Sequence, residues 1–351
     1  MLRWIISGLL AVVLGMTGGC SSQRLPEKDI VKIVQLSLPD MVKQLKSGEI
    51  DGFVAWEPYN TEAVKAATGK YLLKSGDIWQ DHPCCVLAVS EQVTEPHLKE
   101  TLVWAHIKAT DFINNPANKE KTLRYAAEFT GKDRDIVLES LAGIKFVKTV
   151  DKEQFRNYFN DLVKSKLLKR SLQEIGFSGE EAFGNDFLDQ RIYRQVNGKL
   201  AVNPSWKPDA VSLNNEIRLG HIDKDLHELQ LYIGIKEGYF QSVGLTPGKN
   251  LKIKPYANGV AVMEAFKTRE LDASYLGGAP ATLKRVNDDI KIRIQAGANN
   301  EGSAIIVGTG AGIASVRDLA GKTIAVPGIG TVQYFLLDKA VKKEQLKLVV
   351  R

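Results

Sequence analysis

The sequence of 351 residues has little cysteine: one residue at position 20 and two adjacent residues, Cys84 and Cys85. Neighbouring residues of a strand point to opposite faces of a sheet, so we expect neither a disulfide between Cys84 and Cys85 nor a metal site. We interpret both as small buried residues. The chain therefore has no disulfide framework, and no metal or cofactor is expected.

Basic clusters and catalytic constellations are also lacking. The 47 Lys and Arg residues exceed the 41 Asp and Glu residues by only six, and they are scattered, which excludes a nucleic-acid-binding protein. No Ser/His/Asp, Cys/His or paired-carboxylate arrangement with a defined spacing appears, so we do not expect an enzyme. His97 and His106 have no carboxylate or thiol partner at a suitable spacing and are interpreted as surface or core residues.

The first twenty residues differ from the rest. A positive start, Met1–Arg3, precedes an apolar run, Trp4–Val13, and a small-residue stretch that ends at Cys20. This pattern is typical of a secretory signal peptide and is too short for a membrane-spanning helix. The last four residues resemble a lipoprotein cleavage box, although Leu is usual where Thr17 stands. We expect Cys20 to become lipidated; a plain signal peptide cleaved nearby is the alternative.

One stretch of the chain occurs twice. Met41–Ser90 aligns without a gap on Val262–Ala311 after a shift of 221 positions, which brings Asp51 onto Asp272. In both copies an amphipathic helix ends in a polar turn, and a short apolar strand then leads into a loop that contains Pro. Strands that alternate with helices favour a parallel α/β sheet, so the repeat predicts two structurally equivalent halves.

The order of these units is unusual. The second half reads strand, helix, strand, repeat from Glu216 to Ala311, whereas the first half lacks the opening strand and helix. That unit lies at the far end of the chain, at Lys322–Gln345, so the sequence looks circularly permuted. At the seam, Val31–Leu36 should occupy the sheet, because it leads directly into the next helix, and Lys347–Arg351 should lie beside it at an edge.

Ligands of open α/β sheets lie at the carboxyl ends of the strands, where this chain has Gly-rich loops before helices. Such loops present backbone N–H groups to an anion, aromatic rings wall a site, and Glu or His pairs with a charged group. A tight turn at Gly328–Gly330, a helix-cap role for Glu57 and hinge packing of Trp56 are the alternatives. The candidate ligand-binding residues are Trp56, Glu57, His82, His221, His227, Gly277, Gly278, Ala279, Asn300, Gly330 and Thr331.

Three motifs carry a resemblance to a known family: Asp272–Pro280 (DASYLGGAP), Lys322–Thr331 (KTIAVPGIGT) and Glu49–Pro58 (EIDGFVAWEP). They are similar to motifs of the nitrate/taurine/sulfonate group of ABC-transporter substrate-binding proteins, and Asn299–Ser303 and His82–Cys85 fit the same resemblance. It covers residues 28–170 and 214–351. It implies an α/β, two-lobe periplasmic-binding-protein type II fold, with the two halves in circularly permuted order because family members begin with the part found here at 214–351.

The resemblance also implies a division of the chain. The expected segments are a lipoprotein-type signal peptide at 1–20, the second part of lobe 2 at 28–82, the C-terminal strand and helices of lobe 1 at 83–170, a linker at 171–213, the N-terminal part of lobe 1 at 214–307 and the first part of lobe 2 at 308–351.

The function that the resemblance implies is the extracytoplasmic solute-binding component of an ABC importer, for a small anionic or zwitterionic solute of the sulfonate, taurine or nitrate type. Its expected partners are the permease and ATPase subunits and, through the lipid anchor, the outer face of the membrane. Glu57 would favour an amine-bearing solute such as taurine. The alternatives are an enzyme like the pyrimidine-precursor synthases of thiamine biosynthesis, which resemble this family but carry a cysteine-rich motif, and a ligand-sensing domain.

Overall fold

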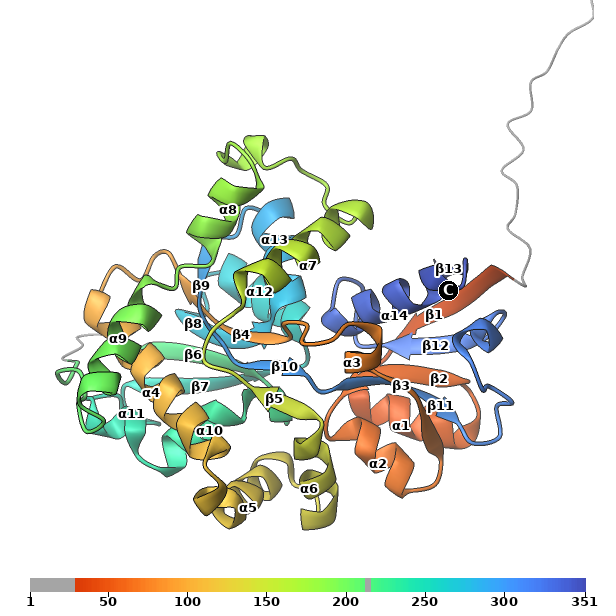
Figure 1. Ribbon diagram of the computed structural model, residues 1–351, viewed down its shortest axis with the longest axis horizontal. Helices are drawn as coiled ribbons and strands as arrows, with labels where there is room; N and C mark the ends of the chain where they lie inside the picture. Colours follow the sequence, from red (N-terminus) through yellow and green to blue (C-terminus); the bar gives the residue numbers. More distant parts are fainter. Residues whose placement is uncertain (1–28, 212–215) are drawn as a thin grey trace, which may run out of the picture.

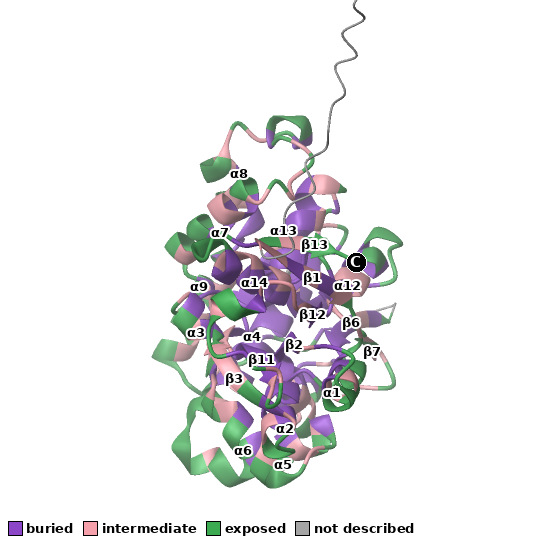
Figure 2. Cartoon of the chain, turned by 90° about the vertical axis from the view of Figure 1, so that its right-hand side faces the viewer, coloured by how far each residue is buried: buried purple, intermediate pink, exposed green. Residues whose placement is uncertain are grey.

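Two β-sheets form the centres of two lobes (Figure 1). The computed structural model describes residues 29–211 and 216–351, so the expected signal peptide and Cys20 lie outside the described part of the chain. Buried residues gather along the strands, and the outer faces of the helices are exposed (Figure 2). Among the described helices, none combines the length and the apolar character that crossing a membrane requires. The fold is the two-lobe α/β architecture that the sequence predicts.

Lobe 1 is built on a five-stranded sheet with the order β7-β6-β8-β4-β9. Strands β6, β7 and β8 are parallel, and β4 runs antiparallel to both of its neighbours. The strands are β4 (Cys85–Ser90), β6 (Ile217–Ile222), β7 (Leu251–Tyr256), β8 (Ala273–Gly277) and β9 (Ile292–Gly297).

Lobe 2 is built on a six-stranded sheet with the order β13-β1-β12-β2-β11-β3. Here β11 is the antiparallel strand, between β2 and β3. The strands are β1 (Ile30–Gln35), β2 (Gly52–Trp56), β3 (Gly69–Lys74), β11 (Ser303–Gly308), β12 (Thr323–Val326) and β13 (Lys347–Val350).

Helices cover both sheets (Figure 1). Those that belong to the sheet of lobe 2 or border it are α1 (Leu38–Ser47), α2 (Tyr59–Lys65), α3 (Ser75–Ile78) and α14 (Val332–Lys343). The others are α4 (Pro96–Asn114), α5 (Lys119–Thr130), α6 (Arg134–Ala142), α7 (Lys152–Lys164), α8 (Glu180–Phe187), α9 (Arg191–Val202), α10 (Leu229–Lys236), α11 (Tyr239–Ser242), α12 (Gly259–Lys267) and α13 (Gly278–Asn287).

The predicted repeat is confirmed element by element over its first part. The bounds of β2, shifted by 221 positions, are the bounds of β8; α1, shifted in the same way, begins where α12 begins and ends one residue after it. Local signals fix these helices: Ser37 and Asn258 accept N–H groups at the two helix starts, and α1 ends at Gly48, whose φ of 76° glycine adopts readily. Equivalent sequences therefore form equivalent units in the two lobes.

The lobes exchange strands through two connections. Residues 79–84 carry the chain out of lobe 2 into β4 of lobe 1, and residues 298–302 carry it out of lobe 1 into β11 of lobe 2. The second connection contains β10 (Asn299–Glu301), which pairs with β5 (Ile144–Phe146) in a small antiparallel sheet between the lobes (Figure 1). Each central antiparallel strand thus arrives from the opposite lobe.

The predicted seam is confirmed. Strand β1 pairs in parallel with β12 inside the sheet, and β13 pairs with the other side of β1 at the sheet edge. The C-terminus therefore lies at the outer edge of lobe 2 (Figure 1).

The segment 171–213, predicted to be a linker, is largely structured in its described part. It contains α8 and α9, and Phe183 and Phe187 of α8 are fully buried with ring centroids 5.1 Å apart. These two aromatic residues, four positions apart, place a short apolar stripe on α8 that packs against α7 and β9. Burial of aromatic side chains thus orders a segment whose periodicity is weak.

Candidate ligand-binding site between the lobes

A narrow, partly open cavity with a free volume of about 10 Å³ lies between the lobes, at the carboxyl ends of β2, β6 and β8. This is the position predicted from the general behaviour of open α/β sheets. Lobe 2 contributes Trp56, Thr331, Val332 and Gln333, and lobe 1 contributes Cys84, Cys85, Ile222, Asp225, Gly259, Gly277 and Pro280.

Three helices begin at this cavity. Helix α12 starts at Gly259, α13 at Gly278 and α14 at Val332, so the N-termini of helices from both lobes converge on the same space. Gly259 permits this approach, because a Cβ atom there would lie 2.5 Å from Cγ of Pro280. Each helix start carries partial positive charge, so the cavity is electropositive from its backbone.

Trp56 brings a hydrogen-bond donor with no acceptor in the described residues. Its side chain is 3% exposed, and its indole Nε1 is buried without a partner. The indoles of Trp79 and Trp104, by contrast, donate to Oε1 of Gln154 and to the carbonyl of Trp206, both at 2.9 Å. A buried donor without a partner costs about 1–3 kcal/mol, so the Trp56 N–H is the group in this wall that an acceptor on a ligand would satisfy.

Glu57 does not line this cavity, and its contact with the solute stays a prediction. Its Oε2 accepts the N–H of Thr61 and the hydroxyl of Ser140, each at 3.1 Å, and its Oε1 accepts the Tyr71 hydroxyl at 3.3 Å. Burial raises the pKa of Glu57, and these hydrogen bonds oppose the shift. The observed contact is that of a helix cap, the alternative interpretation of Glu57, because the Thr61 N–H that it accepts lies in the first turn of α2.

None of the three candidate histidines, His82, His221 and His227, is among the residues that line the cavity. His221 places Nδ1 3.0 Å from the carbonyl of Ile222 and packs against the Phe129 ring, and His82 places Nδ1 3.2 Å from the carbonyl of Pro83. Burial lowers the pKa of both. His106, interpreted as a core or surface residue, is a fully buried core residue.

Among the remaining candidates, Gly277 and Thr331 line the cavity, as Trp56 does. Thr331 caps α14 by accepting the Tyr334 N–H. Gly278 donates its N–H to the carbonyl of Cys84 at 2.7 Å. Ala279 and Gly330 are buried next to lining residues, and Asn300 belongs to β10 in the connection between the lobes.

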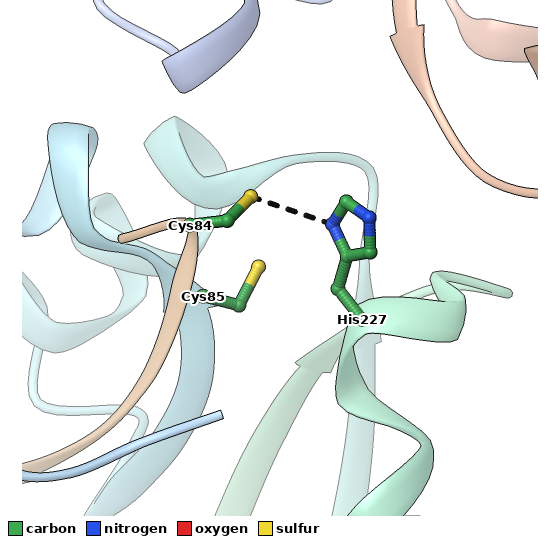
Figure 3. Close-up of side chains that lie close together, drawn as sticks. All are labelled: Cys84, Cys85 and His227. Carbon is green, nitrogen blue, oxygen red and sulfur yellow. Dashed lines mark hydrogen bonds between the residues drawn. The ribbon is translucent and has the colours of Figure 1, made fainter. Parts of the chain in front are cut away.

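The prediction that Cys84 and Cys85 point apart is wrong. Their sulfur atoms and Nδ1 of His227 all lie within 4.8 Å of one another, and both thiols face the histidine (Figure 3). Strand β4 begins only at Cys85, so strand alternation does not govern Cys84. The backbone of Cys84 is instead held by the connection between the lobes, where its N–H donates to the carbonyl of Asn299.

This cluster is strongly polar although it is buried. Sγ of Cys84 lies 3.4 Å from Nδ1 of His227, and Sγ of Cys85 lies 4.0 Å from Oδ2 of Asp225. The Cys85 thiol and the His227 ring hold the pKa of Cys84 well below its usual value. Burial alone would lower the pKa of His227, but Asp225 and Cys84 raise it to about 9. Burial raises the pKa of Asp225 to about 7, against the influence of His227.

Sequence reasoning missed Cys84, Cys85 and Asp225 as site residues. The adjacent pair of cysteines was the feature of the sequence that could have indicated them.

Comparison with known proteins supports a family assignment. A model of the NMT1-like family matches residues 14–127, and a model described as NMT1/THI5 like matches residues 227–348. The chain is 27% identical over 202 residues, 57% of its length, to the nitrate/nitrite binding protein NrtA of Nostoc sp.. It is 35% identical over 104 residues, 29% of its length, to the nitrate import ATP-binding protein NrtC of Synechocystis sp.. The bicarbonate transport ATP-binding protein CmpC of the same organism is 34% identical over 101 residues, 28% of the chain.

The chain spans 38% of the length of NrtA and 15% of the lengths of NrtC and CmpC. The longest of these three matches is to a binding protein, in agreement with the expectation that the chain is not an enzyme. The two family models fall on the two regions that hold the repeated units, and the fold has the two lobes that such proteins share. The two NMT1-type models and the match to NrtA together support a nitrate/taurine/sulfonate-type family of ABC-transporter substrate-binding proteins for this chain.

Proposed function

We propose that the chain is the solute-binding component of an ABC importer and that it encloses a small anionic or zwitterionic solute, of the sulfonate, taurine or nitrate type, in the interlobe cavity. The observation that carries the proposal is the convergence of three helix N-termini and the unpaired Trp56 N–H on one cavity to which both lobes contribute. Each helix start adds about 0.3–1 kcal/mol for an anion, so their convergence matters more than any one of them.

The narrowness of the cavity favours a compact solute. Its free volume of about 10 Å³ is roughly that needed for one water molecule, so the two lobes must move apart to admit a solute. The small planar anions nitrate and bicarbonate require a smaller opening than taurine. The names of the relatives, which refer to nitrate and bicarbonate, support the same choice.

Isothermal titration calorimetry tests the proposal. The purified chain is titrated with nitrate, bicarbonate, taurine and methanesulfonate, with chloride as the reference anion. We expect a dissociation constant near the micromolar range for one of them, equivalent to about −8 kcal/mol. Binding weaker than about millimolar to all four would overturn the proposal.

Two tryptophan variants locate the solute. Trp56→Phe keeps the aromatic wall but removes the indole N–H, and we expect affinity to fall by about ten- to a hundredfold, because a hydrogen bond to a charged group contributes about 1.5–3 kcal/mol. Trp104→Phe is the matched control: its indole N–H is already donated to Trp206, outside the cavity lining. Equal losses in the two variants would place the solute elsewhere.

Partners and location form a further part of the proposal. We infer that the chain is exported, that lipid on Cys20 holds it at the outer face of the membrane, and that it delivers its solute to permease and ATPase subunits. Cys20→Ser should release the protein from the membrane fraction and abolish fatty-acid labelling. Labelling that survives this change would contradict the anchor.

We infer further that the chain has the family's order in permuted form, with the boundaries expected from the sequence. In the sheet of lobe 2, β1 lies beside β12, the strand that precedes α14. In lobe 1, β7 lies in the same way beside β6, the strand that precedes α10, and this correspondence supports the permuted order. A rejoined chain, with residues 216–351 placed before residues 29–211 through a short Gly/Ser linker, should give the same circular dichroism spectrum and the same solute affinity. Failure to fold would contradict it.

A further inference from the structure

At the floor of the interlobe cavity the ligand atoms of Cys84, Cys85 and His227 converge, and the carboxylate of Asp225 lies beside them. Cys84, Cys85 and Asp225 line the cavity, and His227 stands directly behind Cys84 (Figure 3). All four side chains are at least 97% buried. Two thiols, an imidazole and a carboxylate form a ligand set that is suited to borderline and soft metal ions.

The tautomer of His227 is set for coordination. Its Nε2 lies 3.0 Å from the carbonyl oxygen of Gly302, so Nε2 carries a proton and donates it there. The atom left to face the sulfur of Cys84 is Nδ1. Histidines that bind metals generally hold the other ring nitrogen in this way, by donation to a carbonyl or carboxylate.

Gly302 is required for this contact. Its φ is +86°, and a Cβ atom at this position would lie 2.2 Å from Nε2 of His227. The connection between the lobes therefore approaches the imidazole as closely as only a glycine allows, and it fixes the ring in place.

The distances suit a tetrahedral ion. Bonds of about 2.3 Å to sulfur and about 2.0–2.1 Å to nitrogen place the two atoms about 3.6 Å apart in a tetrahedron. Sγ of Cys84 and Nδ1 of His227 are 3.4 Å apart. Asp225 adjoins the other two groups, with Oδ1 3.5 Å from Nδ1 of His227 and Oδ2 4.0 Å from Sγ of Cys85.

The cluster also lacks a positive partner other than His227. No Lys or Arg lies among the described residues that line the cavity. Oε1 of Glu228 is buried without a hydrogen-bond partner, and a second ligand group, Cys85 with Asp225 and Glu228, overlaps the first. Buried polar groups are normally hydrogen-bonded or coordinate a metal ion.

We propose that Cys84, Cys85 and His227 bind a thiophilic divalent metal ion such as Zn²⁺ at the floor of the interlobe cavity, with Asp225 beside the site. Binding displaces to solvent the thiol proton of Cys85 and the one proton shared by Cys84 and Nδ1 of His227, and it involves no change of oxidation state. A bound cation would face the same cavity as the three helix N-termini and would add to the attraction of an anionic solute. The inference shares its site with the proposed function.

Cobalt titration tests the metal site. The full chain is treated with chelator, kept reduced, and titrated with Co²⁺ alone. We expect one equivalent to produce a thiolate-to-cobalt charge-transfer band together with the visible bands of tetrahedral Co²⁺, and Zn²⁺ to abolish both. Cys84→Ser, Cys85→Ser and His227→Gln should each weaken binding by more than about a hundredfold, beyond the effect of changes to outer-shell groups.

The chain offers matched controls. Cys20→Ser removes the remaining cysteine, which the proposed function assigns to the lipid anchor, and His97→Gln removes a histidine whose side chain is 62% exposed; both should bind Co²⁺ as the wild type does. Absence of thiolate bands, or bands unchanged in all three ligand variants, would overturn the proposal. Zn K-edge X-ray absorption of the unaltered chain provides a test that does not depend on the folding of a variant: two sulfur ligands support the site, and a shell of only nitrogen and oxygen overturns it.

Calorimetry with the anions, repeated in chelator and with saturating Zn²⁺, separates this inference from the proposed function. Cobalt bands without anion binding in either condition would support the metal site and overturn the solute proposal. Anion binding without cobalt bands would have the opposite meaning. Anion binding that is tighter with Zn²⁺ supports both.

Discussion

Lobe 1 and lobe 2 have the same strand order at five positions but bring different chemistry to the cavity between them. Strands β7, β6, β8, β4 and β9 correspond in place and direction to β1, β12, β2, β11 and β3, and the register shifts within the last pair of each sheet, β4 with β9 and β11 with β3. Yet the titratable residues of the cavity, Cys84, Cys85 and Asp225, all belong to lobe 1, whereas lobe 2 contributes neutral donors and the start of α14. The two sheets are therefore equivalent in architecture but not in chemistry: lobe 1 supplies the titratable side chains of the cavity, and lobe 2 covers them with neutral groups.

The largest expected effect comes from breaking the core of one lobe. Phe53 on β2 of lobe 2 is fully buried, and Phe53→Ala should lower the free energy of unfolding by about 3–5 kcal/mol. Because each sheet contains a central strand that arrives from the other lobe, we expect the lobes to unfold together. Hydrogen–deuterium exchange should then show equal loss of protection in β2 and β8.

Leu138→Ala is the control, since this side chain is 37% exposed and its truncation should cost little. Loss of protection in β2 with β8 unchanged would mean that the exchanged strands do not couple the lobes.

The second prediction concerns acid, which should act on lobe 1. His106 is fully buried there, with Nδ1 3.0 Å from the Tyr275 hydroxyl and Nε2 2.8 Å from the carbonyl of Gly297. Burial lowers its pKa to about 4; Lys148 adds to the lowering, and Asp111 opposes it. The unfolded chain, with a His pKa of about 6.5, binds the proton first, so stability present above pH 6.5 is lost as the pH falls toward 4.

The part of this loss due to His106 is on the order of 3 kcal/mol. Urea unfolding between these two pH values measures it as the difference between the wild type and His106→Gln, which lacks the titrating group. His97→Gln should keep the full pH dependence. The same slope in all three proteins would show that other groups carry the acid sensitivity.

The sequence predicted those parts of the fold that local signals and connectivity decide. The repeated helix and strand follow from apolar spacing and from caps such as Ser37, and the place of β1 follows from its direct connection to α1. Of the site, the same reasoning located the cavity and Trp56, Gly277 and Thr331, because strand ends and helix starts are local features.

The remaining parts depend on contacts between distant residues. Glu57 accepts a hydrogen bond from Ser140, which lies 83 positions away in the chain. The pattern of apolar residues along the sequence cannot predict a contact over that distance. Cys84 takes its direction from Asn299 rather than from the alternation of a strand, which is why the paired thiols were misread. The aromatic residues of α8 became interpretable only with β9 and α7 in place.

A smaller effect is expected from Glu57→Gln, which tests whether this residue contributes to the stability of lobe 2 or to solute binding. The amide retains one acceptor for Thr61, Ser140 and Tyr71, so we expect a loss of about 1–3 kcal/mol in stability and an unchanged solute affinity. Chemical unfolding and calorimetry on the same sample measure the two quantities. A clear fall in affinity at unchanged stability would return Glu57 to the solute site.

The smallest effect should follow removal of the one strand that lobe 1 lacks. A chain cut after Leu346 loses β13, whose Val349 and Val350 are 39% and 52% exposed, and it loses the hydrogen bond from the Arg351 N–H to the Ile33 carbonyl. β1 then becomes an edge strand, as β7 already is in lobe 1. The hydrogen bonds of an edge strand are replaced by hydrogen bonds to water, so the truncation should lower the free energy of unfolding by only about 1 kcal/mol. Solute affinity should not change, because no residue of β13 lines the cavity.

Leu346→Ala in the full chain is the contrasting variant: this side chain is only 1% exposed, and its truncation should cost about 2–5 kcal/mol. If the shortened chain were less stable than that variant, or bound its solute more weakly than the full chain, β13 would be a necessary part of the lobe 2 sheet, and the correspondence between the two lobes would end at β1.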